Sequence, residues 1–167
     1  RADSPLSDVE TGAVCDQAFE SWKLDGKRVL LIVPDHTRTC PIPLLFRLAY
    51  EKLASRVKTL DVLVALGTHP PMPMERIYQR VGITAEEHRT RYPRAQFFNH
   101  EYQNPAALAK VGTLTRSQVN TITEGRFAMD VDITINRMVL EHDVSIIIGP
   151  VFPHEVVGFS GGNKYLF

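Results

Sequence analysis

The sequence of 167 residues has no excess of charge of either sign and no long apolar run. Nineteen Lys and Arg side chains balance nineteen Asp and Glu side chains. A balanced chain offers no basic face to a polyanion, so nucleic acid and acidic membrane surfaces are not expected partners. The longest apolar runs, such as 144–151, have the length of a strand and are far too short to span a bilayer. Internal repeats and low-complexity tracts are also missing, and the length suits one domain.

Cysteine is scarce as well, with only Cys15 and Cys40 in the chain. Neither belongs to a CxxC pair, so a structural zinc site is not expected. A disulfide between the two stays open at this point. A reducing, cytoplasmic setting is the simpler interpretation of so few cysteines.

What the sequence does contain is an alternation of apolar segments and polar loops. Residues 28–33 form a continuous apolar run, which is typical of a strand covered on both faces of a parallel sheet. This pattern predicts an α/β layered domain with a largely parallel sheet and flanking helices. Further strands are expected at 60–65, 96–99, 133–136 and 144–151, and helices at 43–57, 73–81, from Thr84 and at 137–142. Residues 111–130 are compatible with either a hairpin or an extended surface segment.

Four polar clusters directly follow predicted strands, at the edge where open parallel sheets bind ligands. They span residues 35–38, 67–69, 99–101 and 154–164, and we expect them to converge on one site. In the first cluster, Asp35 and Arg38 either pair with each other, or Arg38 binds a carboxylate or phosphate while Asp35 orients it or accepts from a ribose hydroxyl. In the second, Gly67 either forms a plain turn or lets the backbone approach a ligand closely.

Two histidines at strand ends, His100 and His154, are candidate acid/base groups. Histidine has an intrinsic pKa that suits proton transfer near neutral pH, and such a pair could flank one carbon atom. The alternative for each is a structural or exposed histidine. The glycine turn at 160–164 presents backbone N–H groups to an anion. It lacks the GxxxxGK[ST] pattern of a P-loop, so a plain turn between strand and helix is the other interpretation.

These segments resemble the nickel-dependent lactate racemases and their homologues. Residues 35–38 are similar to the D-x-T-R segment of that family, and residues 66–72 to its G-x-H-R-P-M turn, with Pro70 in place of the usual arginine. Residues 153–164 closely resemble its P-H-x-x-x-G-F-S-G-G-x-K segment. The motifs occur in the family's order and cover the chain from Val29 to the final residue.

The resemblance implies an isomerase, a racemase or epimerase of 2-hydroxy acids that works by reversible hydride transfer. It implies a nickel-pincer nucleotide as the cofactor, joined covalently to Lys164. It also implies that His100 and His154 are the two acid/base groups and that Arg38 holds the substrate. The other residues expected around the cofactor are Asp35, Thr37, Gly67, His69, Ser160, Gly161 and Gly162, and no residue of this chain is expected to bind the metal.

The resemblance further implies that residues 1–167 are the amino-terminal catalytic and cofactor-attachment domain of a longer protein. A missing carboxy-terminal domain would then supply a nickel-binding histidine, cofactor-synthesis enzymes would be partners, and the isolated chain would be inactive. Pro70 and His36 depart from the family's pattern, so the 2-hydroxy acid need not be lactate. Two rival hypotheses remain: a non-catalytic nucleotide-binding paralogue, and a metal-dependent hydrolase with His69, His100 and His154 as ligands.

Overall fold

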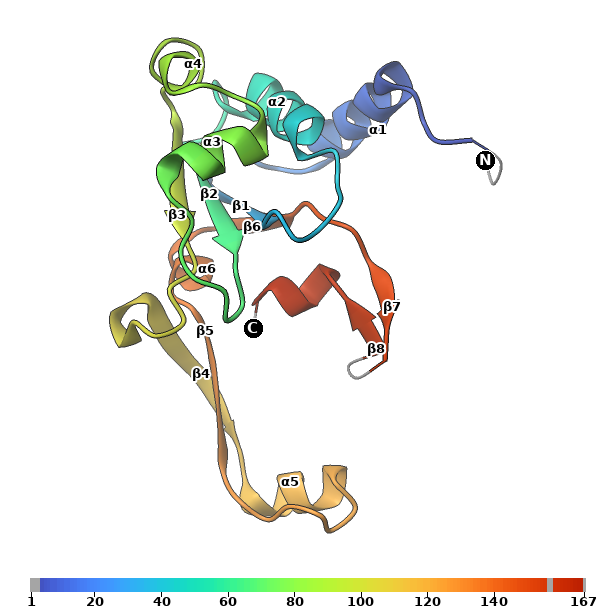
Figure 1. Cartoon of the computed structure of the whole chain (residues 1–167), viewed down its shortest axis with the longest axis vertical. Coiled ribbons are helices and arrows are strands. Elements are labelled where there is room, and N and C mark those ends of the chain that lie inside the picture. The colour runs from blue at the N-terminus through green and yellow to red at the C-terminus, as the bar shows by residue number, and fades with distance from the viewer. Residues whose placement is uncertain (1–3, 156–157, 167) are drawn as a thin grey trace.

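The computed structural model describes residues 4–155 and 158–166. Its centre is a four-stranded sheet in the order β3-β2-β1-β6 (Figure 1). The strands are β1 (Arg28–Pro34), β2 (Thr59–Ala65), β3 (Ala95–Asn99) and β6 (Val144–Ile147). Every neighbouring pair is parallel, so the carboxyl ends of all four strands lie at one edge. The predicted α/β fold with a largely parallel sheet is confirmed.

One face of the sheet is covered by a layer of helices, α1 (Asp8–Ser21), α2 (Ile42–Leu53) and α3 (Met74–Val81). The layer is seen above the sheet in Figure 1. Helix α2 begins with a proline in its first turn, where the missing N–H costs nothing. It buries Ile42, Phe46, Ala49 and Leu53 at helical spacing. Each large apolar side chain removed from water here contributes about 1.5–3 kcal/mol to folding.

The opposite face is covered by two short elements, α6 (Met138–Glu141) and the 3-10 helix η2 (Gly162–Leu166). Leu30 and Ile32 of β1 point to this side, whereas their neighbours in the strand point to the helical layer. The apolar run of β1 is continuous because both faces of the strand are buried. Through η2 the last described residues lie against the sheet.

Residues 108–136 form an arm that extends away from the layers (Figure 1). Strand β4 (Leu108–Leu114) pairs antiparallel with β5 (Val131–Asn136), and α5 (Arg116–Ile122) lies at the far end. Of the two alternatives for 111–130, the structure is nearer to the hairpin, but the range holds only the end of β4, and α5 between the two strands was not predicted. The strand predicted at 133–136 is confirmed, but it belongs to this arm and not to the parallel sheet.

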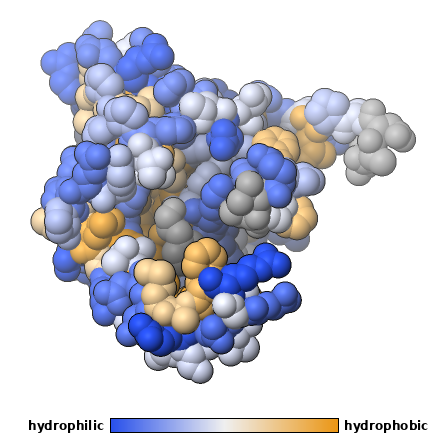
Figure 2. Space-filling view, turned by 60° about the horizontal axis from the view of Figure 1, so that its bottom comes forward, coloured by the Kyte–Doolittle hydropathy of each residue, from blue (hydrophilic) through white to orange (hydrophobic). Residues whose placement is uncertain are grey.

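The arm is held mainly by its own backbone ladder and by surface contacts. Lys110 Nζ lies 2.7 Å from Asp132 Oδ1 across the ladder, and both side chains are more than half exposed. Ile122, Phe127 and Met129 are exposed apolar side chains near its far end. Figure 2 is turned so that this end comes forward, and it shows apolar groups there among polar ones. The arm therefore adds little to the core.

Several local predictions are confirmed by cap geometry. Gly82 ends α3 in the left-handed conformation, with φ of 74°. Thr84 begins α4 (Ala85–Thr90) with a capping box to Glu87. Helix α1 has the same signal, because Ser7 caps it and pairs with Glu10. The sequence prediction missed this helix although its capping box was visible.

Two predicted elements are shorter than expected. The strand predicted over 144–151 ends at Ile147. The Ile148 N–H still donates to the Ile32 carbonyl at 2.9 Å, and Pro150 beyond it has no N–H with which to continue the ladder. Gly149 instead contacts the Tyr165 ring, and a Cβ at this glycine would lie 2.6 Å from Tyr165 Cε2. The helix predicted over 43–57 gives way to turns after Leu53.

After β6 the chain forms a small antiparallel hairpin of β7 (Phe152–His154) and β8 (Gly158–Ser160). A second 3-10 helix, η1 (Pro105–Ala107), precedes β4. Cys15 and Cys40 are both free thiols, so the open disulfide alternative is not realised. Within the described ranges, we find no helix with the length and apolar character needed to cross a membrane.

Candidate functional site

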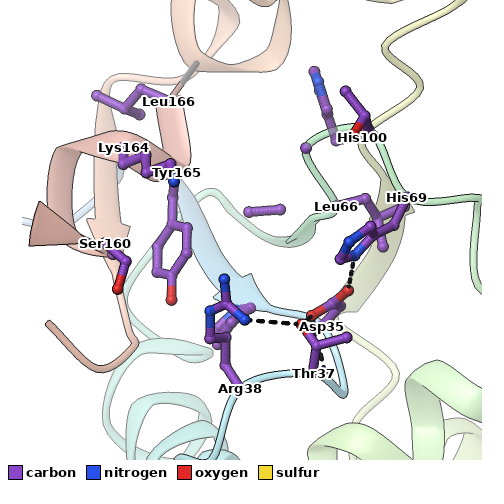
Figure 3. A pocket seen from close by; sticks show the side chains of 15 residues that line it. Asp35, Thr37, Arg38, Leu66, His69, His100, Ser160, Lys164, Tyr165 and Leu166 are labelled. Carbon is purple, nitrogen blue, oxygen red and sulfur yellow. Dashed lines mark hydrogen bonds and ion pairs between the residues drawn. The ribbon is translucent and has the colours of Figure 1, made fainter. Parts of the chain in front are cut away.

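A cavity of about 320 Å³ lies at the carboxyl edge of the parallel sheet (Figure 3). All four predicted clusters contribute to it, as the topology of a parallel sheet requires. Its lining includes Asp35, Thr37, Arg38, Gly67, His69, His100, Ser160, Gly161 and Lys164. The structure therefore brings together every predicted site residue except His154 and Gly162.

Asp35 is the acidic residue of the cavity lining and is only 3% exposed. Its Oδ1 accepts from the backbone N–H of Thr37 at 3.0 Å and from the Thr37 hydroxyl at 2.6 Å. Its Oδ2 lies 2.6 Å from Nδ1 of His69. Burial alone raises the pKa of Asp35, but the hydrogen bonds from Thr37 and His69 outweigh it and leave the pKa below its ordinary value. The carboxylate is therefore ionised at neutral pH.

An ionised Asp35 determines which nitrogen of His69 carries the proton. A carboxylate only accepts, so Nδ1 of His69 donates to it and Nε2 of the neutral ring keeps a lone pair. The His69 side chain is 52% exposed, so this lone pair is accessible. The arrangement suits a proton acceptor oriented by a carboxylate.

Arg38 does not pair with the carboxylate that precedes it by three residues. The two oxygens of Asp35 bind Thr37 and His69, and Arg38 donates instead to Thr37 Oγ1 at 3.4 Å. Of the two alternatives for this cluster, the self-contained ion pair is thus not formed. The guanidinium lies at the cavity, where it can meet an anion (Figure 3).

The loop that carries these groups is clamped by Arg80 of α3, a residue that the sequence prediction missed. Arg80 Nε donates to the Pro34 carbonyl at 3.0 Å, and its NH2 group donates to the Arg38 carbonyl at 2.8 Å. One side chain therefore fixes both ends of the segment 34–38. The contact spans more than forty residues, and no local pattern indicates it.

His100 follows β3, and its backbone N–H continues the sheet by donating to the Val64 carbonyl at 3.1 Å. Its Nδ1 lies 3.1 Å from the side-chain Nδ2 of Asn136, which is 5% exposed. Burial lowers the pKa of His100, so the neutral ring is favoured at neutral pH. Asn136 was not among the predicted site residues.

The opposite wall of the cavity is built by residues 158–166. Strand β8 ends at Ser160, which is 7% exposed, and η2 presents Lys164. Gly161 joins the two with φ of 76°, a conformation that favours glycine. A Cβ at this position would clash with the carbonyl oxygen of Pro150. The glycine thus serves close backbone packing behind the cavity.

Tyr165 is a further lining residue that sequence reasoning missed. Its hydroxyl oxygen is buried, and among the buried side-chain nitrogen and oxygen atoms of the described residues it is the one without a hydrogen-bond partner. Figure 3 shows the hydroxyl directed to the same part of the cavity as Arg38 and Ser160. Burial raises the pKa of Tyr165 against the opposing effect of Arg38, so the group stays protonated and can donate. An unpaired buried donor beside a guanidinium suits an anionic ligand.

The two predicted residues outside the cavity lining lie close to it in the chain. His154 is half-buried on β7, where it pairs with Gly158 across the hairpin, and its Nδ1 is 3.8 Å from Glu155 Oε2. Gly162 begins η2, directly after the lining residue Gly161 and two residues before the lining residue Lys164. Across residues 4–155 and 158–166, no three His, Cys, Asp or Glu side chains form a group that could hold a metal ion. The metal-hydrolase hypothesis, with its three histidine ligands, gains no support from this geometry.

Comparison with known proteins gives a consistent result. Residues 12–167 match the family described as the lactate racemase N-terminal domain. A lactate racemase of Thermoanaerobacterium thermosaccharolyticum is 26% identical over 140 residues, which is 83% of this chain and 28% of the relative. A lactate racemase of Lactiplantibacillus plantarum is 27% identical over 170 residues, which is 95% of this chain and 35% of the relative.

A solved structure is also similar. The crystal structure of a protein from Thermotoga maritima aligns with a TM-score of 0.83 and 34% sequence identity. The alignment covers 97% of this chain and 38% of that protein. The chain therefore spans about a third of the length of the proteins it matches.

Proposed function

The chain belongs to the lactate racemase N-terminal domain family, and from that membership we propose that it forms the catalytic part of a racemase or epimerase of 2-hydroxy acids. The observation that carries the proposal is one cavity lined by Arg38, His69 and Lys164. These side chains supply an anion-binding group, a proton acceptor and an amine for covalent attachment. A 2-hydroxy acid needs the first two, because it has a carboxylate and a hydroxyl proton.

The carboxylate of the substrate binds to Arg38 and the Tyr165 hydroxyl. A guanidinium offers two parallel N–H donors to a carboxylate. The Tyr165 hydroxyl adds a neutral donor that has no partner among the described residues. A buried donor without a partner costs about 1–3 kcal/mol. A carboxylate that accepts from the Tyr165 hydroxyl removes this cost, which favours its binding.

The hydroxyl proton of the substrate is taken by His69. Asp35 holds the proton of His69 on Nδ1, so Nε2 accepts the incoming proton and the ring becomes an imidazolium. The ionised carboxylate beside it stabilises that positive charge, as in other histidine–carboxylate pairs. The sequence assigns the acid/base roles to His100 and His154, and we add His69 because of this contact.

Inversion of the carbon centre needs an acid/base group for each face of the substrate. We propose His154 for the second face, as the sequence predicts. Its support is that β7 carries it on the same hairpin that delivers Ser160 to the cavity. His100 is the third histidine of the proposal. It lies on the cavity wall, and its neutral form is favoured because burial lowers its pKa.

The cofactor that we propose is the nickel-pincer nucleotide implied by the resemblance. The wall formed by residues 158–166 fits such a group, because Lys164 offers an amine for covalent linkage and Ser160 offers a hydroxyl donor to an anion. When bound, the cofactor supplies a reversible acceptor for the α-hydride of the substrate. The role of this chain is to position the substrate and to move the hydroxyl proton.

We propose that the chain is the amino-terminal catalytic and cofactor-attachment domain of a longer protein. The matched relatives are about three times as long, which leaves room for a carboxy-terminal domain that completes the site. Cofactor-synthesis enzymes are the partners that such a protein requires. With two free thiols in the chain, a reducing cytoplasmic setting fits the proposal.

The test is racemisation by the full-length gene product that contains these 167 residues, made together with cofactor-synthesising enzymes. Each enantiomer of lactate and of other small 2-hydroxy acids is supplied separately, and chiral chromatography follows the appearance of the opposite enantiomer. We expect interconversion of at least one pair. A protein that carries the covalent adduct but inverts none of the acids would refute the racemase assignment and leave the attachment site standing.

A further inference from the structure

The two histidines that line the cavity have partners of opposite hydrogen-bonding character. Nδ1 of His69 faces a carboxylate of Asp35, whereas Nδ1 of His100 faces the side-chain amide of Asn136. A carboxylate accepts a hydrogen bond, and an amide nitrogen donates one. The identity of the partner therefore decides where the proton of each neutral ring lies.

The orientation of the Asn136 amide is determined by its other contact. The backbone N–H of Met138 lies 3.0 Å from Asn136 Oδ1. A backbone N–H only donates, so the atom that faces it must be the oxygen of the amide. The amide nitrogen is then left to face His100, and the reversed orientation would place two donors against each other.

Met138 is itself held in place, so Asn136 cannot easily turn. The Met138 carbonyl accepts from Nδ1 of His142 at 2.7 Å, and His142 Nε2 lies 2.8 Å from Asp61 Oδ2. The His142 side chain is only 7% exposed and the Asp61 side chain 16%. These contacts fasten α6 to β2, and they keep the Met138 N–H directed at Asn136.

From these contacts we infer that Asn136 is a positioning residue that holds His100 with its proton on Nε2, as a hydrogen-bond donor to the ligand in the cavity. His69 and His100 are then complementary: one presents a lone pair and the other an N–H. This inference rests on the proposed function for the nature of the ligand and on the contacts alone for the tautomer.

The complementarity suits the chemistry of a 2-hydroxy acid. As its hydroxyl loses a proton and its carbon loses a hydride, the oxygen becomes a carbonyl, which only accepts hydrogen bonds. A lone pair at His69 suits the hydroxyl, and an N–H at His100 suits the carbonyl. A donor aimed at the atom on which charge develops stabilises the transition state. Burial, which lowers the pKa of His100, keeps the ring neutral and the Nδ1 lone pair available to Asn136.

The experiment is nitrogen-15 NMR of the histidine rings in the full-length protein. The sequence contains six histidines, and a His100→Gln variant assigns the signals of His100. Long-range proton–nitrogen correlations distinguish the two neutral tautomers without any enzymatic assay. We expect His100 of the wild-type protein to carry its proton on Nε2 at mildly alkaline pH. A proton on Nδ1 would overturn the inference before any substitution is made.

Two variants then test the role of Asn136. In Asn136→Asp the carboxylate still accepts from Met138, but it now also accepts from the ring, so we expect the proton of neutral His100 to move to Nδ1. In Asn136→Ala neither tautomer is imposed, and we expect a mixture. Asn104→Asp is the matched control, because it adds the same charge four residues after His100 and retains the contact with the Ala106 N–H. It should keep the wild-type pattern.

The outcomes separate this inference from the proposed function. If Asn136→Asp leaves the His100 pattern unchanged, Asn136 does not fix the tautomer and the inference is wrong. If the wild-type pattern is as expected but the protein inverts no 2-hydroxy acid, the proposed function fails and the role of Asn136 stands. In the active protein, we expect Asn136→Asp to slow inversion about five- to tenfold, the effect of losing one hydrogen bond.

Discussion

The two walls of the cavity differ in how their polar groups are satisfied. The strand-end wall, formed by the loops after β1, β2 and β3, is internally bonded: Asp35 holds Thr37 and His69, and Asn136 holds His100. The C-terminal wall, formed by residues 158–166, leaves the buried Tyr165 hydroxyl without a partner. Hydrogen bonds within a wall fix the orientation of its side chains, whereas a buried donor without a partner is available to a ligand. The first wall thus holds oriented groups for proton transfer beside Arg38, and the second adds an unpaired donor for binding.

The largest expected effect concerns covalent attachment on the C-terminal wall. In the full-length product made with cofactor-synthesising enzymes, Lys164→Ala should abolish the mass adduct, because no other lysine lines the cavity described here. Intact-protein mass spectrometry measures this directly. Lys110→Ala, which removes an exposed lysine of the arm, is the control and should retain the adduct. An adduct that survives Lys164→Ala would place the linkage at another residue.

The next effect concerns the strand-end wall. In Asp35→Asn, the amide oxygen must face the Thr37 N–H, so the amide nitrogen faces Nδ1 of His69. That contact moves the His69 proton to Nε2 and removes the proton acceptor. We expect inversion to slow by about 10²–10⁴-fold, while the covalent adduct still forms.

Asp132→Asn in the arm is the control for this substitution, because it also exchanges one carboxylate for an amide. An exposed ion pair contributes little to stability, so the rate should stay within about twofold of the wild type. If Asp35→Asn racemises at the wild-type rate, the carboxylate does not orient the base, and the strand-end wall has no special role in proton transfer.

The sequence was sufficient to predict that both walls meet at one edge of the sheet, but it gave only part of their chemistry. Apolar runs and polar strand ends predicted the parallel sheet and the convergence of four loops, because a parallel sheet places all carboxyl ends at one edge. Asn136 and Arg80 could not be found this way. Their contacts join segments 36 and more than forty residues apart, and no local period encodes them.

The arm was the least predictable part of the fold. Its strands alternate between two solvated faces, and most of β4 is not buried, so the apolar pattern that marks a strand is weak. Tyr165 was missed for a different reason. A tyrosine next to a lysine in a glycine turn has no distinctive spacing, and only the burial of its hydroxyl shows that it faces the cavity.

A third prediction compares one glycine from each wall. Gly67 and Gly161 both have positive φ, of 57° and 76°. A Cβ at Gly67 meets open space, whereas one at Gly161 clashes with the Pro150 backbone. Gly67→Ala should therefore lower the free energy of unfolding by about 1–2 kcal/mol, the cost of the left-handed conformation. Gly161→Ala adds an overpacking cost, for a total of about 2–5 kcal/mol.

Urea denaturation of the two variants and the wild type, monitored by circular dichroism, measures this difference. Equal losses in the two variants would mean that the C-terminal wall is not packed tightly against the segment before β7. A larger loss in Gly67→Ala would mean that the strand-end wall is the more constrained of the two.

The smallest expected effect separates binding from stability at Tyr165. Tyr165→Phe removes the unpaired buried hydroxyl and keeps the ring against Gly149. The ligand-free protein should become more stable, by about 1 kcal/mol, because the cost of a buried unsatisfied donor disappears. At the same time, the Michaelis constant for the 2-hydroxy acid should rise about five- to tenfold, since the carboxylate loses one donor. Tyr92→Phe is the matched control, because it removes a hydroxyl from a buried ring that packs against Phe46 in the core and does not line the cavity. It should leave the Michaelis constant unchanged.

If Tyr165→Phe destabilises the protein and binding is unaffected, the hydroxyl has a structural partner, and the C-terminal wall would be as internally bonded as the strand-end wall.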